Sequence, residues 1–203
     1  MAKESTLTNM LLCLFLVALA TSALLGGAYV LTYDMIEAAQ KKGVNDAIAV
    51  VVPAFDNNPS DEAIIKEVDG KRVKIYPAYN NSVPVGYAIE ASSVGFSGPI
   101  LLMVGFLPDG SIHNIAVISH TETPGLGDKI EKKKGNFSIQ FNGKNPADFH
   151  LSVKKDGGDV DAITASTITS RAFCHVVELA YNAFLTVQPS VQVQPNDEGN
   201  NYE

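Results

Sequence analysis

The 203 residues of the chain allow one medium domain plus small additional segments, and a content of 46% hydrophobic residues excludes a wholly disordered protein. The formal charge is −7, and Lys and Arg do not cluster beyond Lys132–Lys134, so nucleic-acid binding is not expected. Two cysteines, Cys13 and Cys174, are too few for a disulfide scaffold or for a cysteine-ligated iron–sulfur or zinc site.

The N-terminus carries no charged residue from Ser5 to Tyr33. As a helix at about 1.5 Å per residue, Met10–Leu31 would be roughly 33 Å long, which is enough to cross a hydrocarbon core of about 30 Å. We therefore predict a membrane anchor within residues 1–33. A cleavable signal peptide is the alternative, because Ala18–Ala20 fits a small-residue cleavage site, although the apolar stretch continues beyond it. The few flanking lysines do not set the orientation of the span.

Helix signals follow the anchor. Residues 34–55 are predicted to form a juxtamembrane helix, whose apolar stretch Ala47–Val52 is stopped by Pro53. Asp61–Val68 is predicted to be a short helix or an irregular segment.

The next part of the chain has the pattern of short strands. Segments rich in Val, Ile, Tyr and Phe alternate with Gly, Pro, Asn and Asp, and Pro108–Gly110 is a typical turn sequence. These features predict an antiparallel meander with a further strand after it, over Arg72–Tyr76, Val83–Ala91, Ile100–Leu107, Ser111–Ile118 and Phe149–Lys154.

The last elements are helical. Asp128–Lys134 is predicted to be a solvated helix, while Arg171–Val187 has one continuous apolar stripe with helical spacing. The polar tail from residue 188 to 203 cannot bury a core and is predicted to be flexible. The expected fold is α+β, with one domain over residues 34–187 made of a mainly antiparallel sheet and flanking helices.

Two segments have more polar and glycine residues than packing requires. The loop His120–Gly127 contains two glycines and a proline, so backbone amides can approach a ligand closely, and its Thr and Glu side chains offer polar groups. His120 and Glu122 alone supply only two metal ligands, so no metal site is expected.

The second segment, Asp161–Ser170, has five hydroxyl residues among its last seven and lies directly before the apolar helix. Thr169 or Ser170 is predicted to be the N-cap. Because a helix N-terminus presents unpaired N–H groups and partial positive charge, these hydroxyls could hold, or be esterified by, a phosphate group. An ordinary hydroxyl-rich cap and turn is the alternative interpretation.

Together the two segments resemble the FMN-binding domain of the G subunit of Rnf-type electron transport complexes and of its relative, the C subunit of the sodium-pumping NADH:quinone reductase. That family has an H-x-E-T-P-G-L-G loop, complete here at His120–Gly127, and a D-x-x-S/T-G-A-T-x-T-S segment. The resemblance covers roughly residues 8 to 187, including the Gly95-Phe-Ser-Gly-Pro loop. Chain length favours the Rnf subunit over its longer quinone-reductase relative.

The resemblance implies FMN attached through a phosphoester to Thr167. This chain departs from the family motif at Ala165, where the family has Gly, and at Ser166, where it has Ala; Ser166 is also a rival hydroxyl. No catalytic residue and no metal ligand is expected. The expected contacts with FMN, besides Thr167, are Thr164, Ala165, Ser166, Ile168, Thr169, Glu122, Thr123, Gly125, Leu126 and Gly127.

The resemblance further implies an electron-transfer subunit rather than a stand-alone enzyme. It would relay electrons in an ion-translocating ferredoxin:NAD oxidoreductase complex, with its domain on the outer side of the bacterial inner membrane. Its partners would be the other membrane subunits and, during maturation, a flavin transferase. A stand-alone flavin reductase and a flavin-free membrane-anchored binding or scaffold domain remain as alternatives.

Overall fold

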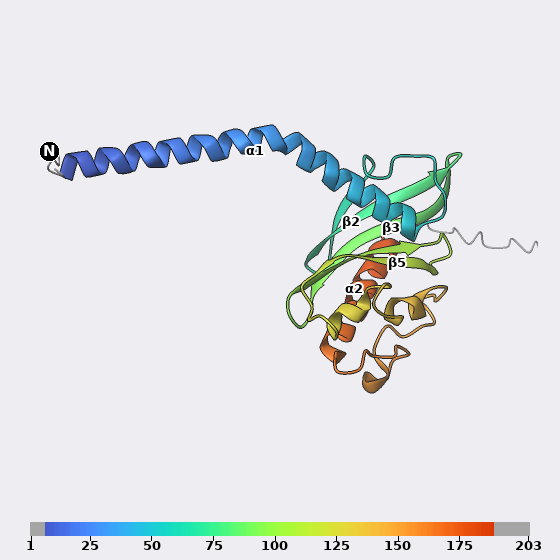
Figure 1. Ribbon diagram of the computed structural model, residues 1–203. Helices are drawn as coiled ribbons and strands as arrows, with labels where there is room; N and C mark the ends of the chain where they lie inside the picture. The colour runs from blue at the N-terminus through green and yellow to red at the C-terminus, as the bar shows by residue number, and fades with distance from the viewer. Residues whose placement is uncertain (1–6, 189–203) are drawn as a thin grey trace, which may run out of the picture. The chain divides into compact units, whose positions relative to one another are not determined.

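The computed structural model describes residues 7–188 (Figure 1). The predicted tail therefore lies outside the described residues, except for Gln188. The chain divides into two compact units, Met1–Val44 and Asn45–Glu203. The predicted boundaries at residues 33 and 187 remain predictions.

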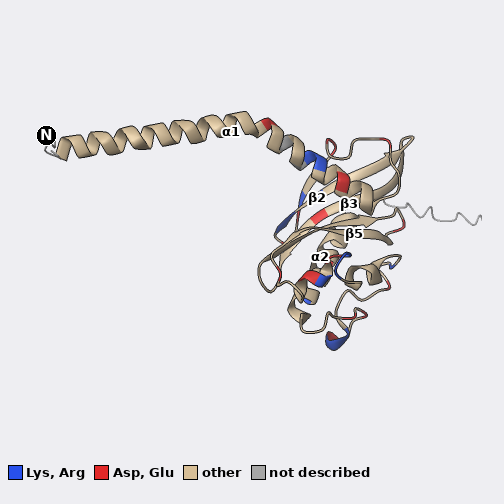
Figure 2. Ribbon diagram, in the orientation of Figure 1, with Lys and Arg blue, Asp and Glu red and all other residues tan. Residues whose placement is uncertain are grey.

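The first unit is helical. A single helix, α1 (Leu7–Val51), runs through the predicted anchor and the predicted juxtamembrane helix without a break, and its last turns belong to the second unit. It ends two residues before Pro53, which cannot donate a backbone hydrogen bond. Within residues 7–188, α1 is the one helix long and apolar enough to cross a membrane, and Figure 2 shows its N-terminal part free of charged residues.

The second unit is built on a five-stranded antiparallel meander in the order β1-β2-β3-β4-β5. The expected α+β fold is confirmed. The strands are β1 (Ile64–Val68), β2 (Lys71–Asn80), β3 (Val83–Val94), β4 (Pro99–Phe106) and β5 (Ile112–His120).

Three local predictions were wrong, and the first concerns the start of the sheet. β1 replaces the expected helix or irregular segment at residues 61–68. Asp69 and Gly70 both adopt positive φ and form a tight hairpin turn, which pairs β1 with β2.

The other two wrong predictions lie between β5 and the C-terminal helix. Phe149–Lys154 forms no strand, only an isolated bridge, since its backbone groups pair within a local loop that includes Lys154 N–H to Val160 O at 2.8 Å. The expected solvated helix at 128–134 is a short 3-10 helix (Gly127–Ile130) with Asp128 and Ile130 buried.

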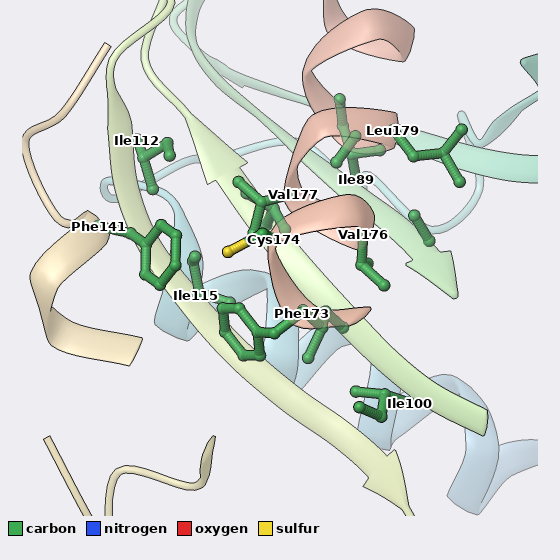
Figure 3. Close-up of a cluster of buried hydrophobic side chains, with 14 of the residues drawn as sticks. Ile89, Ile100, Ile112, Ile115, Phe141, Phe173, Cys174, Val176, Val177 and Leu179 are labelled. Carbon is green, nitrogen blue, oxygen red and sulfur yellow. The ribbon is translucent and has the colours of Figure 1, made fainter. Parts of the chain in front are cut away.

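One face of the sheet packs against α2 (Thr167–Leu185). Figure 3 shows isoleucines of the strands opposite Phe173, Val176 and Val177 of this helix. The predicted apolar stripe of α2 is confirmed along most of its length, although Leu185 at its end is 51% exposed. α2 is thereby held with its first turn at one end of the sheet.

The other face of the sheet receives the last turns of α1, where Ile48 and Val51 are fully buried. The helix lies so close that a Cβ at Gly105 of β4 would be 1.8 Å from the carbonyl oxygen of Val51. β5 also binds the end of the helix: Asn114 donates to Val50 O at 2.8 Å, and His113 Nδ1 lies 3.0 Å from Val51 O. The sheet is therefore covered by a helix on each face.

Candidate functional site

A pocket of about 350 Å³ lies between the two segments that the sequence singled out. Its volume is within the range of small-molecule sites. The lining residues are Phe96, Glu122, Thr123, Leu126, Gly127, Ala165, Ser166, Thr167, Ile168 and Thr169.

The structure thus brings together nine of the eleven predicted contact residues. Thr164 and Gly125 lie outside the lining. Phe96 was not predicted as a contact. An aromatic residue in the glycine-rich loop Gly95-Phe-Ser-Gly-Pro is the sequence signal that could have found it. In the structure the Phe96 side chain is 66% exposed.

The Glu122 side chain holds the pocket walls together. It is 5% exposed, and its Oε1 accepts backbone N–H groups of Phe96 at 2.8 Å and Ser97 at 3.3 Å. Its Oε2 accepts the hydroxyl of Thr169 at 2.7 Å. One buried carboxylate therefore joins the β3–β4 loop, the His120–Gly127 loop and the first turn of α2, and these donors satisfy its charge.

Two glycines make room for this carboxylate. A Cβ at Gly95 would lie 2.1 Å from Oε1 of Glu122, and a Cβ at Gly127 would lie 2.6 Å from its Oε2. No side chain fits at either place without moving the carboxylate. Gly95 and Gly127 are thus required by close packing around Glu122, which the sequence pattern alone does not reveal.

The helix N-terminus at the pocket begins earlier than predicted. Ser166 is the N-cap and Thr167 is the first helical residue, so the assignment of the cap to Thr169 or Ser170 was wrong. Both hydroxyls have other partners: Thr169 donates to Glu122, while Ser170 donates to Ser166 O and accepts the Ile163 N–H.

The start of α2 leaves hydrogen-bond donors free. Ser166 makes no side-chain capping bond, and the backbone N–H groups of Thr167, Ile168 and Thr169 have no partner among the described residues. All four residues line the pocket. Free N–H groups and the positive end of a 19-residue helix are the features that bind anions.

His120 belongs to the support of the loop and not to the pocket lining. Its Nε2 lies 2.6 Å from Oε1 of Glu131, and its Nδ1 accepts the Glu122 N–H. The hydrogen bond from His120, with a further one from Lys134, lowers the pKa of the Glu131 carboxyl. Residues 7–188 contain no cluster of His, Cys, Asp and Glu that could hold a metal ion.

The other histidines lie apart from the pocket. His113 contacts the end of α1, His150 lies beside Asp159, and His175 contacts Lys71. The thiol of Cys174, a residue of α2, is buried in the hydrophobic core, and this burial raises its pKa to about 12. At neutral pH it is therefore a packing residue and not a nucleophile.

The fold and the pocket belong to a known class of domains. Residues 95–182 match the model of the FMN-binding domain family. Among solved structures, the chain is similar to the C subunit of the Na⁺-translocating NADH-quinone reductase from Parabacteroides distasonis. The TM-score is 0.54 at 20% identity, over 75% of this chain and 95% of that one, which is a likeness of fold.

Whole-chain relatives narrow the class further. The chain is 36% identical over 192 residues to the G subunit of the ion-translocating oxidoreductase complex of Haemophilus influenzae strain PittEE, covering 88% of this chain and 92% of that protein. It is also 36% identical over 202 residues to the G subunit of Aliivibrio fischeri, covering 94% and 96%. The chain belongs to the G-subunit family of ion-translocating oxidoreductase complexes, and the predicted resemblance to that family is confirmed.

Proposed function

We propose that this chain carries FMN as a phosphoester on Thr167 and relays electrons within an ion-translocating oxidoreductase complex. Membership of the G-subunit family and the FMN-binding domain support an electron-transfer flavoprotein subunit. Bound FMN supplies the redox chemistry, and this chain supplies orientation, electrostatics and partner surfaces.

The hydroxyl groups around the pocket favour Thr167 as the acceptor, and this is the observation that carries the proposal. Thr169 and Ser170 are buried and already hydrogen-bonded. Thr164 is exposed but does not line the pocket. Thr167 lines the pocket, is partly exposed, and has a hydroxyl with no partner among residues 7–188.

Ser166 is the remaining rival, but it is only 8% exposed. A flavin transferase must reach the hydroxyl that it modifies, and a partly exposed first residue of a helix is the better substrate. The departure at Ser166 therefore does not move the proposed acceptor from Thr167.

The residues present fit an FMN phosphate and ring. The free N–H groups at the start of α2 suit the phosphate, and the apolar side chains of Leu126 and Ile168, which are 41% and 51% exposed, suit an aromatic ring. Thr123 adds a hydroxyl at the wall. The other membrane subunits and a flavin transferase are the partners that this function requires.

The test is the intact mass of the chain isolated from its native membrane, with in-gel flavin fluorescence under denaturing conditions. We expect a mass gain of FMN less one water and a fluorescent band, both lost in Thr167→Ala. Thr164→Ala is the matched control, because it removes a hydroxyl of the same segment outside the pocket, and it should keep the label.

Two results would contradict the proposal at different levels. A label that persists in Thr167→Ala and maps to Ser166 would move the attachment site while keeping the flavoprotein. A native chain without any flavin would favour the alternative of a flavin-free scaffold.

A further inference from the structure

Ser166 is an N-cap serine that does not cap. A serine at this position ordinarily accepts the N–H of the second or third helical residue through its Oγ. Here no such bond forms, and the residue has φ −138° and ψ 44°. The Ser166 carbonyl is used, since it accepts both the N–H and the hydroxyl of Ser170. Only the side chain is left without a partner.

The unpaired hydroxyl opens into the pocket. Ser166 is 8% exposed and lines the pocket, and its Oγ makes no hydrogen bond to the described residues. In residues 7–188 the side-chain oxygens that are fully buried without a hydrogen bond belong to Asn45, Asp128 and Ser138. The Oγ of Ser166 is not one of them, so it is accessible from the pocket. A nearly buried hydroxyl that faces a cavity costs free energy unless water or a ligand in that cavity satisfies it.

The surroundings define the ligand that would do so. The neighbouring backbone N–H groups of Thr167, Ile168 and Thr169 are donors without partners among residues 7–188, and the helix end is partially positive. Donors that converge in this way need an acceptor with several oxygens. Glu122 is not that acceptor, because its two oxygens already hold three other donors.

We propose that the Ser166 hydroxyl donates a hydrogen bond to the phosphate of FMN at the start of α2, as a binding residue and not as the ester acceptor. This inference rests on the proposed function, because it takes FMN as the ligand. The family motif has Ala at this place, so the donor is a feature of this chain.

The contact can be measured apart from the ester bond. In the full-length chain carrying Thr167→Ala, which cannot form the ester, FMN and riboflavin are titrated separately by flavin fluorescence. Adding Ser166→Ala should weaken FMN binding about tenfold, the effect of losing one hydrogen bond to a charged group. Riboflavin lacks the phosphate, so its affinity should not change.

A matched control is available. Ser138, which is fully buried, also has an unpaired Oγ, but it lies outside the pocket. Ser138→Ala in the same background removes a comparable hydroxyl and should leave both affinities unchanged. Unaltered FMN binding in the Ser166→Ala variant, or an equal loss for riboflavin, would overturn the proposal.

The esterified chain gives a second readout. The ³¹P resonance of the phosphoester should shift in Ser166→Ala and stay in place in Ser138→Ala. If the Thr167→Ala chain binds neither flavin, this resonance decides, and an unshifted signal rejects the contact. Failure of the proposed function gives a different result from failure of this contact. A native chain without covalent flavin rejects the ester. The same titrations, run on that chain, still test the Ser166 contact.

Discussion

Ala165 is the residue at which this chain departs from its family's glycine, and the departure has a structural cost. Its φ of +63° lies in the left-handed region, where a Cβ crowds the backbone. We predict that Ala165→Gly raises the free energy of unfolding by up to about 1 kcal/mol, because relief of this strain outweighs the greater flexibility of glycine in the unfolded chain. Urea unfolding of the full chain measures the difference.

Ala162 provides the comparison for this prediction. It is exposed, lies in the same segment and is absent from the residues with positive φ. Ala162→Gly should lower the free energy of unfolding by about 0.4–1 kcal/mol, since only the unfolded-state entropy changes. If both substitutions destabilise equally, Ala165 is not strained.

Leu126 lies on the pocket wall and not in the core. With 41% of its surface exposed, Leu126→Ala should cost less than the roughly 2–5 kcal/mol of a fully buried leucine. In the flavin-loaded chain it should change the visible spectrum and the midpoint potential, because burial and polar contacts set a cofactor's electronics. Spectroelectrochemistry measures both.

Leu185→Ala is the control for Leu126, since Leu185 is 51% exposed and lies at the far end of α2. It should leave the spectrum and the potential unchanged. The ring-contact role of Leu126 fails if the two variants are spectroscopically alike.

At the scale of elements, the contact between α1 and the sheet depends on one missing side chain. A Cβ at Gly105 would overlap the carbonyl of Val51, so Gly105→Ala must push the last turn of α1 off β4. Overpacking of this kind costs about 1–3 kcal/mol. We expect a lower unfolding midpoint and faster hydrogen exchange confined at first to residues 45–51.

Gly43→Ala tests whether this effect is specific. Gly43 is in the same helix, and a Cβ at this position would meet nothing within 4 Å beyond the adjacent helix backbone, so alanine should fit and slightly favour the helix. Equal destabilisation by the two substitutions would show that Gly105 does not set the approach of α1.

The elements differ in how far their sequences reveal them. The strands after residue 70 were predictable because they are rich in Val, Ile, Tyr and Phe and are bounded by turn residues. The helix α2 was predictable because burial on one face imposes a period of 3.6 residues. β1 was not, because its five residues are mostly exposed and only the Asp69-Gly70 turn marks the hairpin. The helix start was misplaced since Thr169 bonds to Glu122, 47 residues away, and Ser170 bonds back to Ile163 and Ser166, which a capping rule does not see.

Part of the pocket could likewise be predicted from the sequence, and part could not. The family resemblance indicated Glu122 and Thr167 as site residues, and both line the pocket. The role of Glu122 in joining three segments was not predictable, because its partners lie 25, 26 and 47 residues away in sequence. Phe96, whose backbone N–H donates to Glu122, also lines the pocket.

At the scale of the whole molecule, one helix carries both the apolar stretch and a part of the domain. α1 is continuous, and its final turns, from Asn45, belong to the second unit. Membrane anchoring follows from membership of a membrane complex and from this apolar helix. Cleavage after Ala20 would leave the apolar residues from Leu24 to Leu31 on the mature chain. A helix exposed to water is not expected to be apolar on all its faces.

The domain can lie on either side of the membrane. Lys41 and Lys42 follow the span, but Asp34 and Glu37 lie between them and it, so charge does not fix the orientation. From the family resemblance we predict that the domain lies on the outer side. A reporter enzyme that folds only after export should be active when fused after residue 203 and inactive when fused before residue 1. The reverse pattern would place the domain in the cytoplasm, and a mature N-terminus at Thr21 would show that the segment is cleaved and the anchor lost.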